Sequence, residues 1–151
     1  MYMSKGIERA RETMNKNIGG PFGAVIVKDD EIISVASNTV LRDCDPTAHA
    51  EVNAIREAGK KLNTYDLTGC TLYATGYPCP MCLSAIMWSN INKVYYGTNL
   101  KDAENIGFRD DFIYEFIRNG NQGKELDIEN IDREECLKLF NEYKQNNSTI
   151  Y

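Results

Sequence analysis

The chain has little of several features, and each shortage excludes a class of protein. It contains no run of about 18 apolar residues, so no transmembrane helix is predicted. Residues 1–9 lack the apolar stretch of a secretory signal peptide, and we therefore expect a cytoplasmic protein. The five cysteines are an odd number in a chain without a secretory signal, which argues against a disulfide framework.

Positive charge is also scarce. The chain has 17 Lys and Arg against 22 Asp and Glu, which gives a formal net charge of −5. Lys60-Lys61 is the only basic cluster. Nucleic-acid-binding proteins normally carry a basic face that neutralises phosphates, so we do not expect nucleic acid as a partner, although a local basic groove stays open. The length of 151 residues fits a single domain over residues 1–151.

Histidine occurs only once, and it lies in one of two stretches that stand out. His49-Ala50-Glu51 offers an imidazole and a carboxylate, and Cys79 and Cys82 offer two thiols at a Cys-x-x-Cys spacing. One nitrogen and two sulfur ligands suit Zn²⁺ better than an ion that prefers oxygen. Three protein ligands leave a fourth position for water, which is the arrangement of catalytic rather than structural zinc sites.

Three other interpretations of these stretches stay open. Cys44 would close the site with a fourth ligand and make it a structural staple. A redox-active Cys-x-x-Cys is possible, but it leaves His-Ala-Glu without a role. The histidine would otherwise be an unrelated core residue beside a chance Cys-x-x-Cys.

Both stretches carry signals for the start of a helix. Thr47 is the predicted N-cap of a helix over residues 48–62, which places His49 in the first turn. Pro80 suits the first position of a second helix, with Cys79 at its cap. The positive ends of both helices would favour thiolate over thiol and hence metal binding.

The spacing of His49 and Glu51 adds a geometric condition. Residues two apart on a helix point to nearly opposite sides, so both side chains reach one site only if it lies over the helix tip. His49 would then bind the metal, and Glu51 would hydrogen-bond the metal's water.

The remaining pattern alternates strands and helices. A three-layer α/β domain with a mixed sheet of about five strands is predicted, with both zinc helices on one face and a parallel strand pair flanking the second of them. The predicted helices are 4–14 (capped by Ser4), 110–117 and 131–144, and the predicted strands are 22–27 and 32–37 (a hairpin), 70–75, 92–97 and a short piece at 126–131.

His-Ala-Glu followed by Pro-Cys-x-x-Cys resembles the signature of the zinc-dependent cytidine deaminase-like superfamily. Residues 46–56, 78–86 and 107–114, with the terminal tyrosine, are similar to its guanine deaminases. The resemblance implies the cytidine deaminase-like α/β/α fold, Zn²⁺ as cofactor, and hydrolysis of guanine to xanthine and ammonia. It also implies a homodimer in which the C-terminal segment, about residues 120–151, is exchanged so that the tail closes the partner's active site.

The same resemblance assigns roles to individual residues. Glu51 and Asp110 move protons, and His49, Cys79 and Cys82 bind zinc. The residues that it places around the base are Asn38, Phe22, Trp88, Asp110, the Ala50 backbone N–H, and Tyr151 contributed by the other subunit. Without it, Asn38 reads as a turn residue, Asp110 as a helix cap, and Phe22 and Trp88 as core.

The chain departs from this family in one loop. Bacterial guanine deaminases carry Cys-Glu where this chain has Gly76-Tyr77. Because the loop borders the pocket, a deaminase of cytosine, another purine or guanosine stays an alternative, followed by a tRNA adenosine deaminase. The non-enzymatic alternative is a zinc-stapled binding module.

Overall fold

A computed structural model describes all 151 residues. The chain divides into two compact units, Met1–Asp110 and Asp111–Tyr151. This boundary precedes residue 120, near which the exchanged segment was predicted to begin. The single domain over residues 1–151 stays a prediction.

The first unit holds a four-stranded sheet in the order β2-β1-β3-β4. β1 pairs antiparallel with β2 and β3, and β3 pairs parallel with β4, so the predicted hairpin and parallel pair are confirmed. The fifth strand that was predicted at residues 126–131 is not formed, and the sheet has four strands. The elements are α1 (Tyr2–Asn15), β1 (Gly23–Lys28), β2 (Glu31–Ser37), α2 (Val40–Asp43), α3 (Ala50–Leu62), β3 (Thr71–Gly76), α4 (Pro80–Trp88), β4 (Lys93–Thr98) and α5 (Leu100–Asn105).

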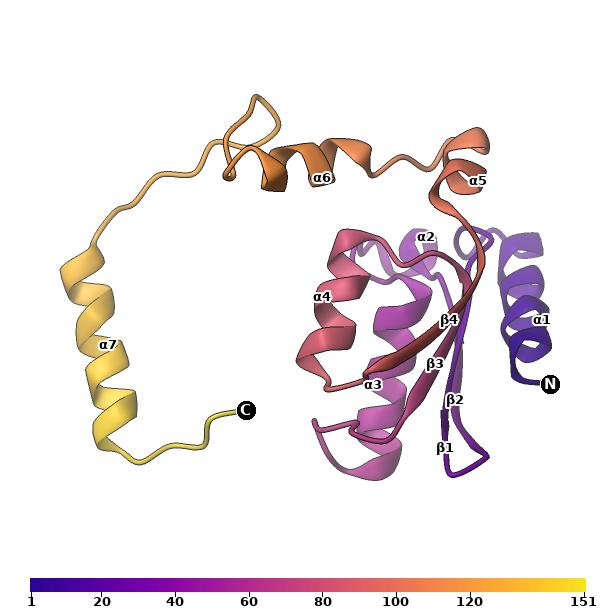
Figure 1. Cartoon of the computed structure of the whole chain (residues 1–151), viewed down its shortest axis with the longest axis horizontal. Helices are drawn as coiled ribbons and strands as arrows, with labels where there is room; N and C mark the ends of the chain where they lie inside the picture. The colour runs from indigo at the N-terminus through magenta and orange to yellow at the C-terminus, as the bar shows by residue number, and fades with distance from the viewer. The chain divides into compact units, whose positions relative to one another are not determined.

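The three layers follow from the alternation of side chains along β1. α1 covers one face of the sheet, and α3 and α4 lie together on the other (Figure 1). Ala24 and Ile26 point into the core cluster on the α3 side, where small residues at Ala54 and Ala58 let the helix approach closely. Val25 points the opposite way, towards α1. Both zinc helices therefore lie on one face, as predicted.

One helix begins earlier than predicted. Ser4 was expected to cap the first helix, but α1 starts at Tyr2 and its N-cap is Met1. The Ser4 hydroxyl donates a hydrogen bond to the Met1 carbonyl at 2.6 Å from inside the first turn. The Ser4 hydroxyl thus bonds to the backbone within the helix and does not mark the helix boundary.

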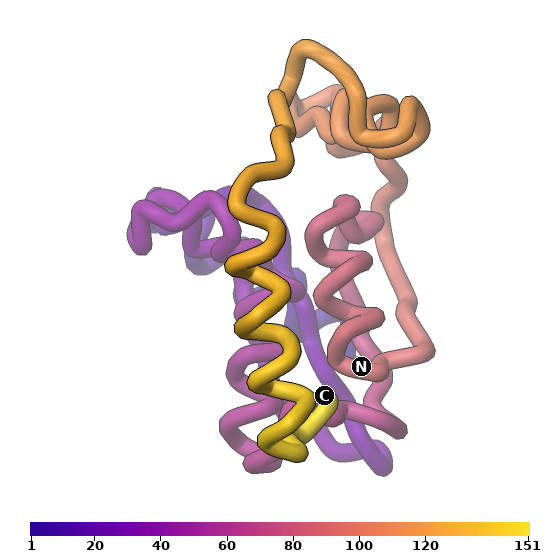
Figure 2. Tube along the Cα trace, turned by 90° about the vertical axis from the view of Figure 1, so that its left-hand side faces the viewer, coloured from indigo at the N-terminus to yellow at the C-terminus, as the bar shows by residue number.

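The second unit consists of α6 (Asp111–Arg118) and α7 (Arg133–Gln145), joined by residues 119–132 without regular structure (Figure 2). The Tyr143 hydroxyl donates to the Thr149 carbonyl at 2.5 Å, which ties the C-terminal residues back to α7. In the chain as a whole, no helix combines the length and apolarity needed to cross a bilayer.

Candidate functional site

The first ligand stretch lies at the tip of α3, but not in the position predicted for it. His49, rather than Thr47, is the N-cap, and its backbone is extended at φ −71° and ψ 157°. Thr47 is held in a preceding turn, because its N–H and hydroxyl both donate to Asp45 Oδ1 at 2.8 and 2.7 Å. The Asp45 carboxylate thus satisfies the donors of Thr47 and leaves the helix to begin two residues later.

The second stretch is arranged as predicted. Cys79 is the N-cap of α4 and Pro80 occupies the first turn. The cap backbone is extended, at φ −66° and ψ 169°, much as at His49. Two helix starts therefore present one metal-ligating side chain each from the cap position, and Cys82 adds the third from within the first turn of α4.

The three ligand atoms are close enough for one ion. His49 Nδ1 lies 3.6 Å from both Cys79 Sγ and Cys82 Sγ, and all three atoms lie within 4.8 Å of one another. Zn–S bonds of ~2.3 Å and Zn–N bonds of ~2.05 Å at tetrahedral angles separate sulfur and nitrogen by ~3.6 Å. The set therefore fits zinc with one coordination position left for a small ligand. Cys44 is exposed and is not part of this cluster, so the closed structural site is excluded.

The charges of the ligands are coupled. The Cys82 thiol and the His49 ring hydrogen-bond the Cys79 sulfur and lower the pKa of Cys79 to about 4. The same contact raises the pKa of Cys82, helped by burial, and the contact with Cys79 raises the pKa of His49. Without metal the pair of thiols therefore holds one negative charge, and a cation in the site replaces the remaining proton.

Glu51 lies beside the ligands, as the spacing argument predicted. Its side chain is only 7% exposed, and its Oε2 atom accepts the Cys82 thiol at 3.4 Å. Burial raises the pKa of Glu51 above its ordinary value. His49 and Glu51 line the same cavity, which confirms that the site lies over the tip of α3.

This cavity has a volume of about 410 Å³, which is ample for a nucleobase. His49 and Cys79 of the ligand cluster line the cavity, and the rest of its wall comes from α2, α3, α5 and the segments between the elements. The lining residues are Gly19, Gly20, Phe22, Asn38, Val40, Leu41, Pro46, His49, Glu51, Tyr77, Cys79, Leu100, Ala103, Phe108, Arg109 and Asp110.

Comparison with known proteins decides the family. Residues 1–98 match the cytidine and deoxycytidylate deaminase zinc-binding region. The chain belongs to this zinc-dependent deaminase family. It is 43% identical to the guanine deaminase of Bacillus subtilis (strain 168), over 95% of this chain and 92% of that one. It is also 36% identical to a tRNA-specific adenosine deaminase of Buchnera aphidicola subsp. Schizaphis graminum (strain Sg), over 83% and 81%.

A solved structure agrees with this placement. The X-ray structure of guanine deaminase from Bacillus subtilis superposes on this chain with a TM-score of 0.92 and 41% identity. The match covers 99% of this chain and 96% of that one. The deaminase is therefore a zinc-dependent aminohydrolase, with His49, Cys79 and Cys82 as its metal-binding cluster.

Asn38 has a definite orientation in the deaminase. Its Oδ1 atom accepts the N–H groups of Gly20 and Val40, each at 3.2 Å. The second of these bonds closes the turn that the sequence allowed as an alternative role. Since both neighbours are donors, the oxygen must face them, and only the NH₂ group of Asn38 is left for a ligand in the cavity.

An aromatic pair forms one wall of the cavity. Phe22 packs edge-on against Phe108 with ring centroids 5.0 Å apart. A Cβ atom at Gly20 would stand 3.1 Å from Phe108 and 3.2 Å from Phe22, so glycine makes room for both rings. Phe22 belongs to the predicted site. Phe108 was missed, although it lies inside the stretch 107–114 that resembles guanine deaminases.

Of the other predicted site residues, some line the cavity and others do not. Asp110 lines the cavity beside Arg109. Ala50 is fully buried as the first residue of α3, where the backbone N–H has no intrahelical acceptor. Trp88 ends α4 with 76% of its surface exposed and does not line the cavity. Tyr151 belongs to the second unit, and its role in a partner's site stays a prediction, as does that of Trp88.

Several cavity residues carried no signal in the sequence. Leu100 and Ala103 come from α5, a short helix that begins with a capping box between Asn99 and Asp102. Apolar residues on so short a helix are indistinguishable from core residues before the fold is known. Tyr77 was noticed only as a departure from relatives, and the structure places it in the lining.

Proposed function

We propose that this chain hydrolyses guanine to xanthine and ammonia. One observation carries the proposal, namely that the similarity to the Bacillus subtilis guanine deaminase extends over 95% of the chain. The similarity to the tRNA-specific deaminase of Buchnera is lower and shorter. The net charge of −5 also disfavours a tRNA substrate. A cytoplasmic location stays a prediction.

The residues around the metal cluster support a hydrolytic mechanism. Bound zinc would lower the pKa of water at the position that the protein leaves open. In the proposed reaction, Glu51 accepts a proton from the attacking water and delivers it to the ring nitrogen beside the reacting carbon. The remaining hydroxyl proton then passes through Glu51 to the amine, which leaves as ammonia while the new C=O bond of xanthine forms.

Recognition of the base is proposed to rest on a few directional groups. The NH₂ group of Asn38 and the N–H of Ala50 donate hydrogen bonds, and the carboxylate of Asp110 accepts one and helps to move protons. These groups suit guanine, whose edge carries both acceptors and N–H donors. A base with the wrong pattern would leave buried polar groups unpaired and would be rejected. Phe22 packs on the ring face.

We propose a homodimer in which the second unit of one chain covers the first unit of its partner. The first unit exposes Met87 and Trp88, and the second unit exposes Phe140, Leu139 and Ile117. Burial of these side chains against a partner would stabilise the proposed dimer. Tyr151 would reach the partner's cavity in this arrangement, and Trp88 would border it.

The test of the function is ammonia release from a panel of substrates. The zinc-loaded protein is given guanine, adenine, cytosine, guanosine and an RNA stem-loop that presents a single-stranded adenosine. We expect kcat/KM for guanine to exceed every other value by at least about 100-fold. Faster turnover of cytosine would mean that the flanking stretches mislead, and turnover of the stem-loop alone would favour the tRNA deaminases. No ammonia from any substrate would favour the binding module.

A further inference from the structure

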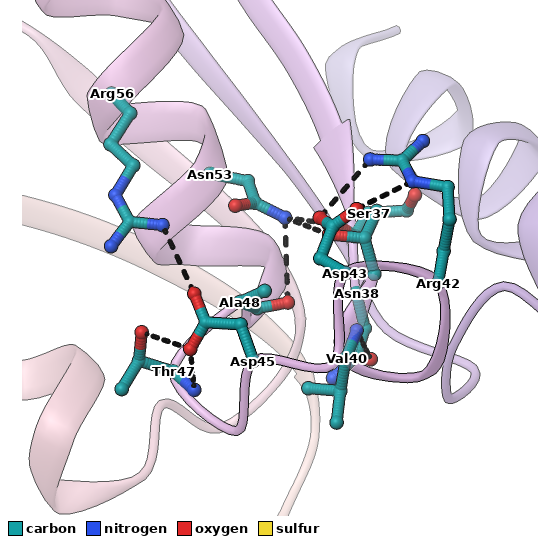
Figure 3. A network of polar contacts seen from close by, with 11 residues as sticks. Ser37, Asn38, Val40, Arg42, Asp43, Asp45, Thr47, Ala48, Asn53 and Arg56 are labelled. Atoms are coloured by element: carbon teal, nitrogen blue, oxygen red, sulfur yellow. Dashed lines mark hydrogen bonds and ion pairs between the residues drawn. The ribbon is translucent and has the colours of Figure 1, made fainter.

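The side-chain amide of Asn53 lies outside the cavity and connects the loop of Asn38 to the N-terminus of α3. Asn53 lies in α3 one turn beyond His49, and its backbone N–H donates to the His49 carbonyl at 2.9 Å. Its Nδ2 atom donates to the Ser37 carbonyl and to Thr39 Oγ1, each at 2.9 Å, and approaches the Ala48 carbonyl at 3.4 Å (Figure 3). The amide therefore contacts the chain on both sides of Asn38 and immediately before His49.

The orientation of this amide follows from its neighbours. The carbonyl oxygens of Ser37 and Ala48 only accept hydrogen bonds. The Thr39 hydroxyl donates its proton to Asp43 Oδ2 at 2.6 Å, so towards Asn53 it presents a lone pair. All three neighbours require the NH₂ group, and the contacts use both of its protons.

The loop that Asn53 holds has further ties to the same helix start. The backbone N–H of Thr39 donates to the Ala48 carbonyl at 3.0 Å. Asp43 is fixed in turn by Arg42, whose Nε atom lies 2.7 Å from Asp43 Oδ1. The orientation of the Thr39 hydroxyl is thus determined by an anchored carboxylate, and the contact with Asn53 has one geometry.

We propose that Asn53 is a positioning residue that sets the distance between Asn38 and the zinc ligand His49, acting through Thr39. The inference rests on the proposed function, in which Asn38 contacts the base. Asn53 touches neither substrate nor metal. The loop of Asn38 comes from the end of β2 and His49 from the tip of α3, and the amide joins the two independently of the sheet. A shift of the loop would misplace the Asn38 NH₂ group while leaving zinc and Glu51 in place.

The test compares four single variants. Asn53→Ala and Thr39→Val remove the two ends of the contact, and Thr39→Ser keeps the hydroxyl and should restore wild-type behaviour. Arg56→Ala is the matched control, because Arg56 lies on the same helix but pairs only at 3.9 Å with Asp45 and makes no hydrogen bond to Asn38 or Thr39 (Figure 3). We expect KM for guanine to rise about tenfold in Asn53→Ala and Thr39→Val, with kcat within about threefold and zinc content unchanged.

Two further measurements separate positioning from general destabilisation. The double variant Asn53→Ala/Thr39→Val should raise KM by clearly less than the product of the two single effects, because the contact between Asn53 and Thr39 is lost in both single variants. The backbone amides of Thr39 and Val40 should exchange with solvent faster in Asn53→Ala than in wild type or Arg56→Ala. An unchanged KM in Asn53→Ala, additive effects in the double variant, or a Thr39→Ser variant as impaired as Thr39→Val would overturn the proposal.

Hydrogen exchange also distinguishes a failure of the positioning role of Asn53 from a failure of the proposed guanine deaminase activity. If wild-type protein releases no ammonia from guanine, the proposed function fails. Exchange at Thr39 and Val40 still reports whether Asn53 holds the loop, and unchanged exchange in Asn53→Ala would overturn that part as well.

Discussion

The Cys82 thiol lies 3.4 Å from Oε2 of Glu51, so one metal ligand and the proposed general base are direct neighbours in a buried site. The two residues come from different helices and are 31 positions apart in sequence. Their contact shows how α3 and α4 assemble the site jointly. It also means that changes at Glu51 must be checked for their effect on metal content.

Replacement of Glu51 tests the mechanism most directly. Glu51→Gln keeps the size of the side chain but removes its ability to accept a proton, so guanine turnover should fall by about 10²- to 10⁴-fold. Ammonia release measures the loss, and metal analysis of the same sample should find zinc retained. Full activity in this variant would exclude Glu51 as the proton carrier.

Metal uptake should release protons in a pH-dependent amount. At pH 7 Cys79, with its pKa of about 4, is already a thiolate, whereas the raised pKa keeps Cys82 protonated and that of His49 leaves it partly protonated. Zinc binding at pH 7 should therefore release between about one and two protons per ion.

The count should approach one as pH rises, because His49 then loses its proton before zinc arrives, and zinc affinity should weaken as pH falls. Calorimetric titration of the metal-free protein in buffers of different ionisation enthalpy measures both. A release near zero at pH 7 would contradict the protonated state assigned to Cys82.

Gly19 should not tolerate a side chain. A Cβ atom there would come within 2.1 Å of the Asn38 carbonyl oxygen and 2.4 Å of its Oδ1, so the loop must move. Gly19→Ala should lower the free energy of unfolding by about 1–3 kcal/mol and raise KM for guanine. The control is Gly6→Ala in α1, where the nearest atoms are 3.5 Å away and alanine should be neutral or stabilising. Urea unfolding measures both, and equal behaviour of the two variants would contradict the packing argument.

Tyr77 should contribute to substrate selection but not to metal binding. Its ring lines the cavity and stands edge-on to Tyr96 at 5.0 Å, and its backbone N–H donates to the Thr98 carbonyl at 2.8 Å. Tyr77→Ala removes the ring from the cavity wall and should lower kcat/KM for guanine about tenfold at unchanged zinc content. Tyr77→Phe keeps the ring and serves as the control. Equal kcat/KM values in both variants would remove Tyr77 from the substrate wall.

The C-terminal tail offers a test of the proposed exchange. Deletion of residues 149–151 removes Tyr151 but leaves α6 and α7, so turnover should be lost while the dimer persists. Sedimentation measures the assembly and ammonia release the activity. An active truncated protein would exclude Tyr151 from the site, and a monomeric wild-type protein would exclude the exchange itself.

Local signals predicted the parts of the site that depend on local chemistry. Pro80 marked the start of α4 and placed Cys79 at its cap. Proline is favoured there because an N–H in the first turn has no intrahelical acceptor, so its absence costs no hydrogen bond. The same reasoning failed at Thr47, whose N–H and hydroxyl donate to Asp45 Oδ1 and hold it in a turn before the helix. Whether Thr47 caps the helix or bonds to Asp45 is decided by backbone geometry, which a sequence does not display.

The supporting contacts were beyond prediction for a different reason. Asn53 bonds to Ser37 and Thr39, which lie 16 and 14 positions away, and no periodic pattern relates them. The partnership of Phe22 with Phe108 spans an even longer separation. Such pairs become visible only when β2, α3 and the loop after α5 have been brought together by the apolar core.

His49 and Cys79 stand 30 positions apart at the starts of two different helices. An ion shared between them would act as a crosslink that ties off the intervening chain, including all of α3 and β3. Much of the conformational freedom that this loop gains on unfolding would then be forfeited for as long as the ion stays bound. Chelators should accordingly abolish activity and also lower the stability of the packing of α3 against α4.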